Sequence, residues 1–131
     1  MRISWAGRVT MPFMVVILAV ACATVQQKSM LLEPGEKSLI IKAGNFKFEP
    51  NRIKAHRGDV LMIKVENVAS TEHNLTLKTP EGNPMMSMDI PAKGTASVKV
   101  NLTEAGIYHF YCDKTLHSTF GMKGEIEVTA P

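Results

Sequence analysis

Short apolar stretches, several with a two-residue period, recur from residue 38 onward and limit the fold more narrowly than any other feature. In Asn45–Glu49, Phe46 and Phe48 alternate with polar residues, which predicts a strand with both rings on one face. After residue 38, no apolar pattern in the sequence repeats at helical spacing over more than two turns. The sequence therefore predicts an all-β domain.

Seven stretches of the sequence have the pattern of strands. They are Ser38–Ala43, Asn45–Glu49, Val60–Asn67, Asn74–Leu77, Thr95–Val100, Ile107–Cys112 and Gly124–Val128. The third has apolar residues on both faces, which is typical of a strand inside a sheet. Three prolines and Gly82 predict that Pro80–Pro91 is one long loop. Seven to eight short strands in a chain of this size favour a Greek-key β-sandwich.

Composition narrows the class of protein further. A chain of 131 residues is long enough for one domain, and a second domain would leave too little core for either. The formal net charge is only +3 and no basic run is present, so nucleic acid is not an expected partner. With only Cys22 and Cys112, the chain is neither a disulfide-dense scaffold nor a four-cysteine metal site.

The N-terminal segment has the three-part pattern of an export signal. Arg2 and Arg8 precede an apolar run from Met11 to Ala21, and small residues follow up to Cys22. As a helix, this run would span only about 16 Å, roughly half of a bilayer core. We therefore expect a signal helix within residues 1–21, a tether at residues 22–37 and the sandwich at residues 38–131.

Three outcomes of export remain open from the sequence. Ala19-Val20-Ala21-Cys22 resembles a bacterial lipobox, which implies cleavage before Cys22 and attachment of lipid to its thiol. Plain cleavage and an uncleaved membrane anchor are the alternatives. All three place the domain outside the cytoplasm, in the periplasm or on the outer face of a membrane, and we expect the lipid-anchored form.

Four side chains have the chemistry of a metal site. Cys112, His117 and Met122 follow one another at five-residue intervals after an apolar strand, and His73 follows an earlier strand. A thiolate, two imidazoles and a weakly bound thioether are the ligands of a trigonal copper site with a long axial bond. Thiolate binds strongly, imidazole serves both oxidation states of copper, and thioether favours Cu(I).

These residues belong to a wider pattern that resembles the cupredoxins, the small blue copper proteins that include plastocyanin, azurin and rusticyanin. The pattern covers about residues 38–129 and comprises Phe46-x-Phe48-x-Pro50, Gly58-Asp59, Asn67, His73-Asn74, Gly106-x-Tyr108-x-Phe110-Tyr111-Cys112 and Gly121-Met122-x-Gly124. The Cys-x₄-His-x₄-Met spacing is that of rusticyanin-like members. The resemblance implies one type 1 copper ion with His73, Cys112 and His117 as equatorial ligands and Met122 as the axial ligand.

The resemblance also implies roles for the residues around the ligands. His117 would lie at the exposed edge, within an apolar docking patch, and would act as the electron port. Asn74 would tie the two ligand loops together by hydrogen bonds, with Asp113 in the position where Ser or Thr is common. Apart from the resemblance, Lys114 and Lys123 flank the expected port, and a pair of exposed lysines is only a weak indication of an acidic docking face.

The expected function is transfer of single electrons by a monomer between redox proteins, such as a cytochrome or a membrane oxidoreductase. The alternative is copper delivery or sequestration with the help of Met85, Met86 and Met88, although we favour packing as the role of these side chains. An enzyme is not expected, because copper oxidases and nitrite reductases need further copper ions and a second such domain. A multicopper oxidase would also have histidine on both sides of the cysteine, where this chain has Tyr111 and Asp113.

Overall fold

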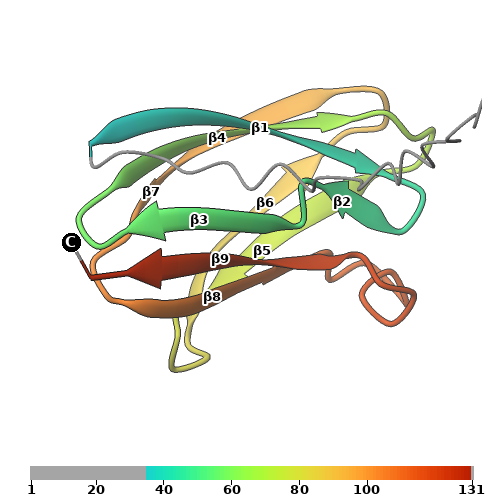
Figure 1. Ribbon diagram of the computed structural model, residues 1–131. Coiled ribbons are helices and arrows are strands. Elements are labelled where there is room, and N and C mark those ends of the chain that lie inside the picture. Colours follow the sequence, from blue (N-terminus) through green and yellow to red (C-terminus); the bar gives the residue numbers. More distant parts are fainter. Residues whose placement is uncertain (1–34, 131) are drawn as a thin grey trace, which may run out of the picture.

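The computed structural model describes residues 35–130, which form strands and turns and no helix (Figure 1). Two sheets face each other across one apolar core. The strands are β1 (Glu36–Gly44), β2 (Lys47–Glu49), β3 (Arg52–His56), β4 (Val60–Asn67), β5 (His73–Lys78), β6 (Pro84–Ile90), β7 (Thr95–Asn101), β8 (Gly106–Tyr111) and β9 (Lys123–Thr129). The predicted all-β sandwich is confirmed, with nine strands in place of the expected seven to eight.

Both sheets mix parallel and antiparallel neighbours. One sheet has the order β2-β1-β4-β7, and the other has the order β3-β9-β8-β5-β6. β1 pairs with β4 and β3 pairs with β9 in parallel, and the other neighbours are antiparallel. β4 has the predicted bounds and lies inside its sheet. Its inward side chains, Leu61, Ile63 and Val65, are fully buried and form the centre of the core.

The prediction of a loop over residues 80–91 was wrong, because β6 occupies most of that range. Pro84 is the first residue of the strand, and β6 lies at the edge of its sheet, where a missing N–H costs no ladder hydrogen bond. The loop is only a short turn closed by hydrogen bonds between Thr79 and Asn83 and from Gly82 to Thr79. β3 was also not predicted, since only Ile53 and Ala55 face the core in its five residues.

Phe46 does not share a face with Phe48, contrary to the prediction. Phe48 is buried in β2, whereas Phe46 lies in the preceding turn with a φ of 59° and is exposed. The left-handed backbone at Phe46 interrupts the alternation that a continuous strand would keep. Its ring is consequently free to contact another part of the surface.

The two ends of the sandwich are built differently. The loop between β8 and β9 lies at the end opposite the C-terminus, together with the turn between β1 and β2 (Figure 1). At the other end, Asp59 is fully buried and accepts hydrogen bonds from the backbone N–H groups of Gly35 and His56 and from Lys37 Nζ. The Asp59 carboxylate therefore ties the start of β1 to the turn before β4.

The predicted signal segment, Cys22 and most of the tether lie outside the described residues. β1 begins at Glu36, two residues before the predicted start of the sandwich. Within residues 35–130, there is no helix long and apolar enough to cross a membrane.

We predict that Asp59→Asn lowers the free energy of unfolding at pH 7 by about 1–3 kcal/mol. Burial raises the pKa of Asp59, but the hydrogen bonds from His56 and Gly35 and the ammonium of Lys37 outweigh it and hold the pKa below its usual value. A lowered pKa stabilises the fold above about pH 4, and this contribution disappears as the pH falls further. Urea unfolding at pH 7 and pH 3 should show a difference that narrows in acid.

Glu36→Gln is the matched control, because it removes an exposed carboxylate that pairs with Lys99. Such surface pairs contribute little to stability, so this variant should unfold like the wild type at both pH values. Equal stability of the two variants at pH 7 would contradict the role assigned to Asp59.

Candidate metal centre

The pairing of β5 with β8 brings the predicted ligands together. The two strands are antiparallel, with Thr76 opposite Tyr111 and Leu77 opposite Phe110. Continuing this register places the start of β5 beside the residues that follow β8. His73 and Cys112, which are 39 positions apart in the chain, therefore meet at one end of the sandwich.

Three donor atoms converge at this point. Cys112 Sγ lies 3.3 Å from His117 Nδ1 and 4.0 Å from His73 Nδ1, and the two Nδ1 atoms are 3.2 Å apart. His73 and Cys112 are buried, and His117 is half-buried. Within the described residues, this trio is the group of His, Cys and acidic side chains whose geometry could hold a metal ion.

The distances between the three donor atoms are close to those of a trigonal planar metal site. Bonds of about 2.0 Å to nitrogen and 2.3 Å to sulfur at 120° put the donor atoms about 3.5 to 3.7 Å apart. The three observed separations lie on either side of this range. A cation bound between the two Nδ1 atoms would take a lone pair from each ring, in place of the single hydrogen bond that one ring can donate to the other at 3.2 Å.

The environment keeps the imidazole of His73 ready to bind. Burial lowers the pKa of His73, and the nearby His117 lowers it further, so the neutral ring is favoured. A neutral imidazole is the form that binds a metal. Its Nδ1 faces Cys112 and His117. Its Nε2 is buried and has no hydrogen-bond partner among the described residues.

Backbone hydrogen bonds close the loop that carries the other ligands. The N–H of Cys112 donates to the carbonyl of Met122, and the N–H of Met122 donates to the carbonyl of His117, each at 3.0 Å. Gly121 has a φ of +102°, which lets the loop turn back toward β9. Met122 is consequently buried next to the ends of the loop, in the same core as Cys112.

Asn74 connects the two ligand segments. Its Oδ1 accepts a 2.8 Å hydrogen bond from the N–H of Asp113, and its Nδ2 donates to the Asp113 carboxylate. The backbone N–H of Asn74 also points at Cys112 Sγ at 3.4 Å. Thr76 donates to the other Asp113 oxygen and lies 2.9 Å from the hydroxyl of Ser87. The loop after the thiol is thus fixed to β5 and β6.

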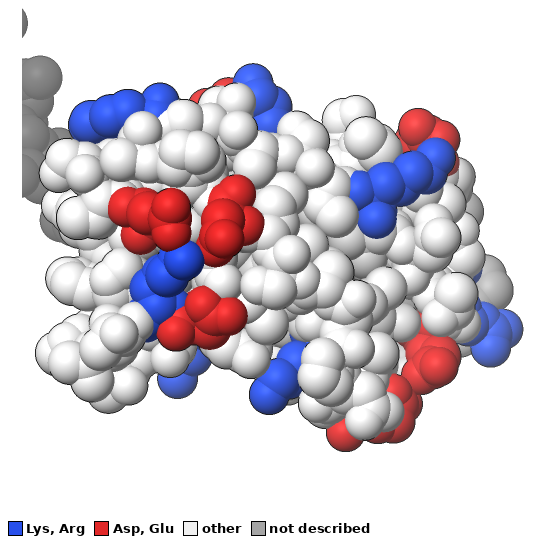
Figure 2. Space-filling view, turned by 180° about the vertical axis from the view of Figure 1, so that it is seen from behind, with Lys and Arg blue, Asp and Glu red and all other residues white. Residues whose placement is uncertain are grey.

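Lys114 does not supply a free positive charge beside the site. Its Nζ lies 2.6 Å from Glu72 and 3.0 Å from Asp89, and these two carboxylates raise its pKa well above the usual value. Figure 2 shows one cluster of Asp and Glu side chains around a cationic side chain on the face of the molecule that is turned away in Figure 1. The ion pairs around Lys114 therefore do not support the predicted preference for an acidic docking face.

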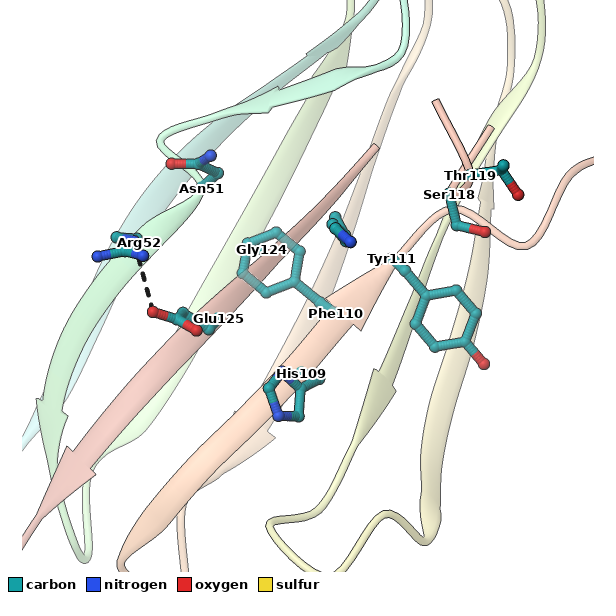
Figure 3. A pocket seen from close by; sticks show the side chains of 10 residues that line it. Asn51, Arg52, His109, Phe110, Tyr111, Ser118, Thr119, Gly124 and Glu125 are labelled. Atoms are coloured by element: carbon teal, nitrogen blue, oxygen red, sulfur yellow. Dashed lines mark ion pairs between the residues drawn. The ribbon is translucent and has the colours of Figure 1, made fainter. Parts of the chain in front are cut away.

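A groove of about 620 Å³ lies beside the ligand loop, on the outer face of β8 and β9. Figure 3 shows His109 and Tyr111 projecting from β8 into it, and Arg52 of β3 paired with Glu125 of β9. None of His73, Cys112 and His117 lines this groove. The groove and the donor trio are therefore separate features, and His109 points away from the ligands.

The three methionines of β6 do not point to one place. Met86 and Met88 are half-buried and pack against the core, whereas Met85 is exposed. The pairing with β5 is irregular at Met85: Leu77 lies opposite Met86 and Lys78 lies opposite Pro84, so Met85 has no partner residue in the ladder. Packing accounts for Met86 and Met88.

Comparisons with known proteins agree with this fold and site. Residues 13–128 match the family model described as a cupredoxin-like domain. Plastocyanin of Daucus carota is 33% identical over 92 residues, which are 66% of this chain and 91% of that protein.

Two solved structures are also similar to this chain. Auracyanin from the photosynthetic bacterium Roseiflexus castenholzii has a TM-score of 0.63 at 17% identity over 73% of this chain and 97% of its own. Auracyanin A from Chloroflexus aurantiacus, described as a blue copper protein, has a TM-score of 0.63 at 20% identity over 72% and 99%.

The protein is thus a small β-sandwich with a cysteine–histidine metal site at one end. The chain belongs to the cupredoxin family. His73, Cys112, His117 and Met122 form its type 1 copper site.

Sequence reasoning missed several residues that shape the site. Phe46 meets the ring of His117 edge-on at a centroid distance of 5.2 Å and lies 5.4 Å from the ring of Phe120. Thr76 and Ser87 complete the contacts of Asn74 and Asp113. The sequence signal for Thr76 was its position: it lies two residues after Asn74, so both side chains project from the same face of β5.

We predict that Asn74→Ala weakens copper binding about 10- to 100-fold while leaving the four ligands in place. The variant loses the hydrogen bonds that hold the loop after Cys112 against β5. Competition with a chelator of known affinity measures the effect. Asn101→Ala, on the exposed face of β7, is the control and should bind like the wild type. Equal affinities for all three proteins would contradict the positioning role of Asn74.

Proposed function

We propose that this protein carries single electrons between redox proteins. The observation that supports this most directly is the convergence of one thiol and two imidazoles within 4.8 Å at the end of a rigid sandwich. Copper bound there would supply the exchange of one electron between its Cu(II) and Cu(I) states. Met122 is the proposed axial ligand, because it is buried and its backbone is bonded to both Cys112 and His117.

Preorganisation by the protein is the physical basis of the proposal. The pairing of β5 with β8 and the hydrogen bonds of Asn74 hold the donor-bearing segments against each other. A site whose ligands are fixed by the fold has little freedom to rearrange when an electron enters or leaves. Small rearrangement favours rapid electron transfer in both directions.

The proposed electron port is His117. It is half-buried, and its neighbours Phe46, Leu116 and Phe120 are exposed apolar side chains. We call these three side chains the apolar patch. Exposed apolar side chains gathered at one place mark a site of protein contact. A partner that covers the patch would approach the copper site through the ring of His117 and would exclude water from the contact.

Two further parts of the proposal concern activity and location. We propose that the protein is not an enzyme. The described residues contain one potential metal site, and all the ligands of this site would be used to bind the copper ion. We also propose that it is an exported monomer, attached to a membrane through lipid on Cys22, whose partners are redox proteins such as a cytochrome or a membrane oxidoreductase. The signal-like pattern of residues 1–22 supports export.

Copper delivery or sequestration is the second candidate function. The arrangement of β6 does not favour a copper site built from its three methionines. A site made from Met85, Met86 and Met88 would need all three sulfurs on one side of the strand. Met85 is exposed at an irregularity in the β5–β6 ladder, whereas Met86 and Met88 pack against the core. We therefore favour the electron carrier.

We predict that the full-length protein becomes intensely blue when it is loaded with Cu(II), because a thiolate bound to Cu(II) absorbs strongly by charge transfer. Cys112→Ser should abolish the colour, since it removes the sulfur. His109→Ala is the control, because His109 is exposed and points away from the ligands. Optical spectra measure the effect. A colourless wild type with one equivalent of bound Cu(II) would contradict the proposal.

We predict that Phe120→Lys slows electron self-exchange between two copies of the protein by about tenfold or more, without changing the optical spectrum. Phe120 is 63% exposed in the apolar patch, and a charge there repels the same charge on a second copy. Line broadening in nuclear magnetic resonance of mixed oxidised and reduced protein measures the rate. Ile40→Lys, an exposed apolar position on β1, is the control. Equal rates for the two variants would rule out the apolar patch as the contact surface.

A further inference from the structure

Asp113 is the charged side chain closest in the chain to the thiol ligand. It follows Cys112 directly, and its carboxylate does not form an ion pair with a cation among the described residues. Its Oδ2 accepts a 3.1 Å hydrogen bond from Thr76, and its Oδ1 accepts one from the amide of Asn74. Two neutral donors therefore hold a negative charge at a fixed position beside the metal site.

The neighbouring charges do not cancel this one. Lys114, the next residue along the loop, is engaged by Glu72 and Asp89. Lys123 projects from β9 on the outer face of the sheet, opposite Tyr111. A carboxylate near a metal favours the more positive oxidation state, because its attraction grows with the charge of the ion.

We propose that the carboxylate of Asp113 lowers the reduction potential of the copper site by stabilising Cu(II) relative to Cu(I). This inference rests on the proposed function, because it concerns the potential of the same one-electron site. Asp113 has two roles: it positions Asn74 through hydrogen bonds, and it supplies a fixed negative charge near the copper site. The charge is the part that sets the potential.

The two roles of Asp113 can be separated by the sign of the change. If Asp113 only positions Asn74, its loss loosens the N–H of Asn74 from Cys112 Sγ. A thiolate with one fewer hydrogen bond gives more electron density to Cu(II), so the potential would fall. If the negative charge is what matters, neutralising it raises the potential.

Asp113→Asn keeps the hydrogen-bond network and removes the charge. The new amide oxygen can accept from Asn74, and the new NH₂ group can donate to Thr76, whose own proton can turn to Ser87 at 2.9 Å. Asp89→Asn is the matched control, because it removes the same charge from the edge strand β6, where the carboxylate is paired with Lys114. Asp113→Ser removes the charge with a smaller polar group.

The experiment is cyclic voltammetry of the copper-loaded full-length proteins, with thermal unfolding of the copper-free proteins as a measure of folding. We expect Asp113→Asn and Asp113→Ser to shift the midpoint potential upward, and by more than Asp89→Asn does. The unfolding midpoint of Asp113→Asn should match that of the wild type.

An unchanged or lower potential in both Asp113 variants would overturn the inference, as would an equal shift in Asp89→Asn. In these cases a reversible one-electron wave of the wild type leaves the proposed function intact. A wild type that is not blue and shows no such wave would overturn both.

Discussion

The antiparallel pairing of β5 with β8 is the constraint on which the rest of the site depends. It places His73 and Asn74 beside Cys112 and Asp113, which are far away in the chain. Hydrogen bonds of Asn74 to Cys112 and Asp113 then connect the two ligand segments. His117 and Met122 are then positioned by a single loop whose two ends are joined by backbone hydrogen bonds. A shift of register by one residue would turn each of these side chains to the opposite face of the sheet.

The two ends of the sandwich have different roles, one in stability and the other in metal binding. At one end, buried Asp59 gathers two backbone N–H groups and Lys37, and this charge serves stability. At the other end, the polar groups around Asp113 serve the metal site, and the apolar patch beside His117 stays exposed. Exposed aromatic rings cost solubility, so their presence at the metal end is consistent with a surface reserved for contact with other proteins.

Much of this could be predicted from the sequence, for identifiable physical reasons. β4 was predicted with its exact bounds because eight residues with apolar side chains on both faces leave few alternatives to an interior strand. The ligand set was predictable because Cys112, His117 and Met122 follow one another at five-residue intervals, within a pattern that resembles the cupredoxins. β6 was missed because prolines normally exclude a strand, and only its place at the sheet edge permits Pro84. The position of Phe46 depends on a left-handed φ that no residue pattern revealed, and the pairing of Lys114 depends on acidic residues from two other segments.

The central claim is that the fold holds one set of copper ligands in the same arrangement in both oxidation states. X-ray absorption at the copper edge tests it most directly, in the oxidised and the reduced protein. The account predicts one sulfur and two nitrogen neighbours at short distance in both states, with little change in bond length between them. A missing short sulfur neighbour, or a set of neighbours that changes when the copper is reduced, would contradict it.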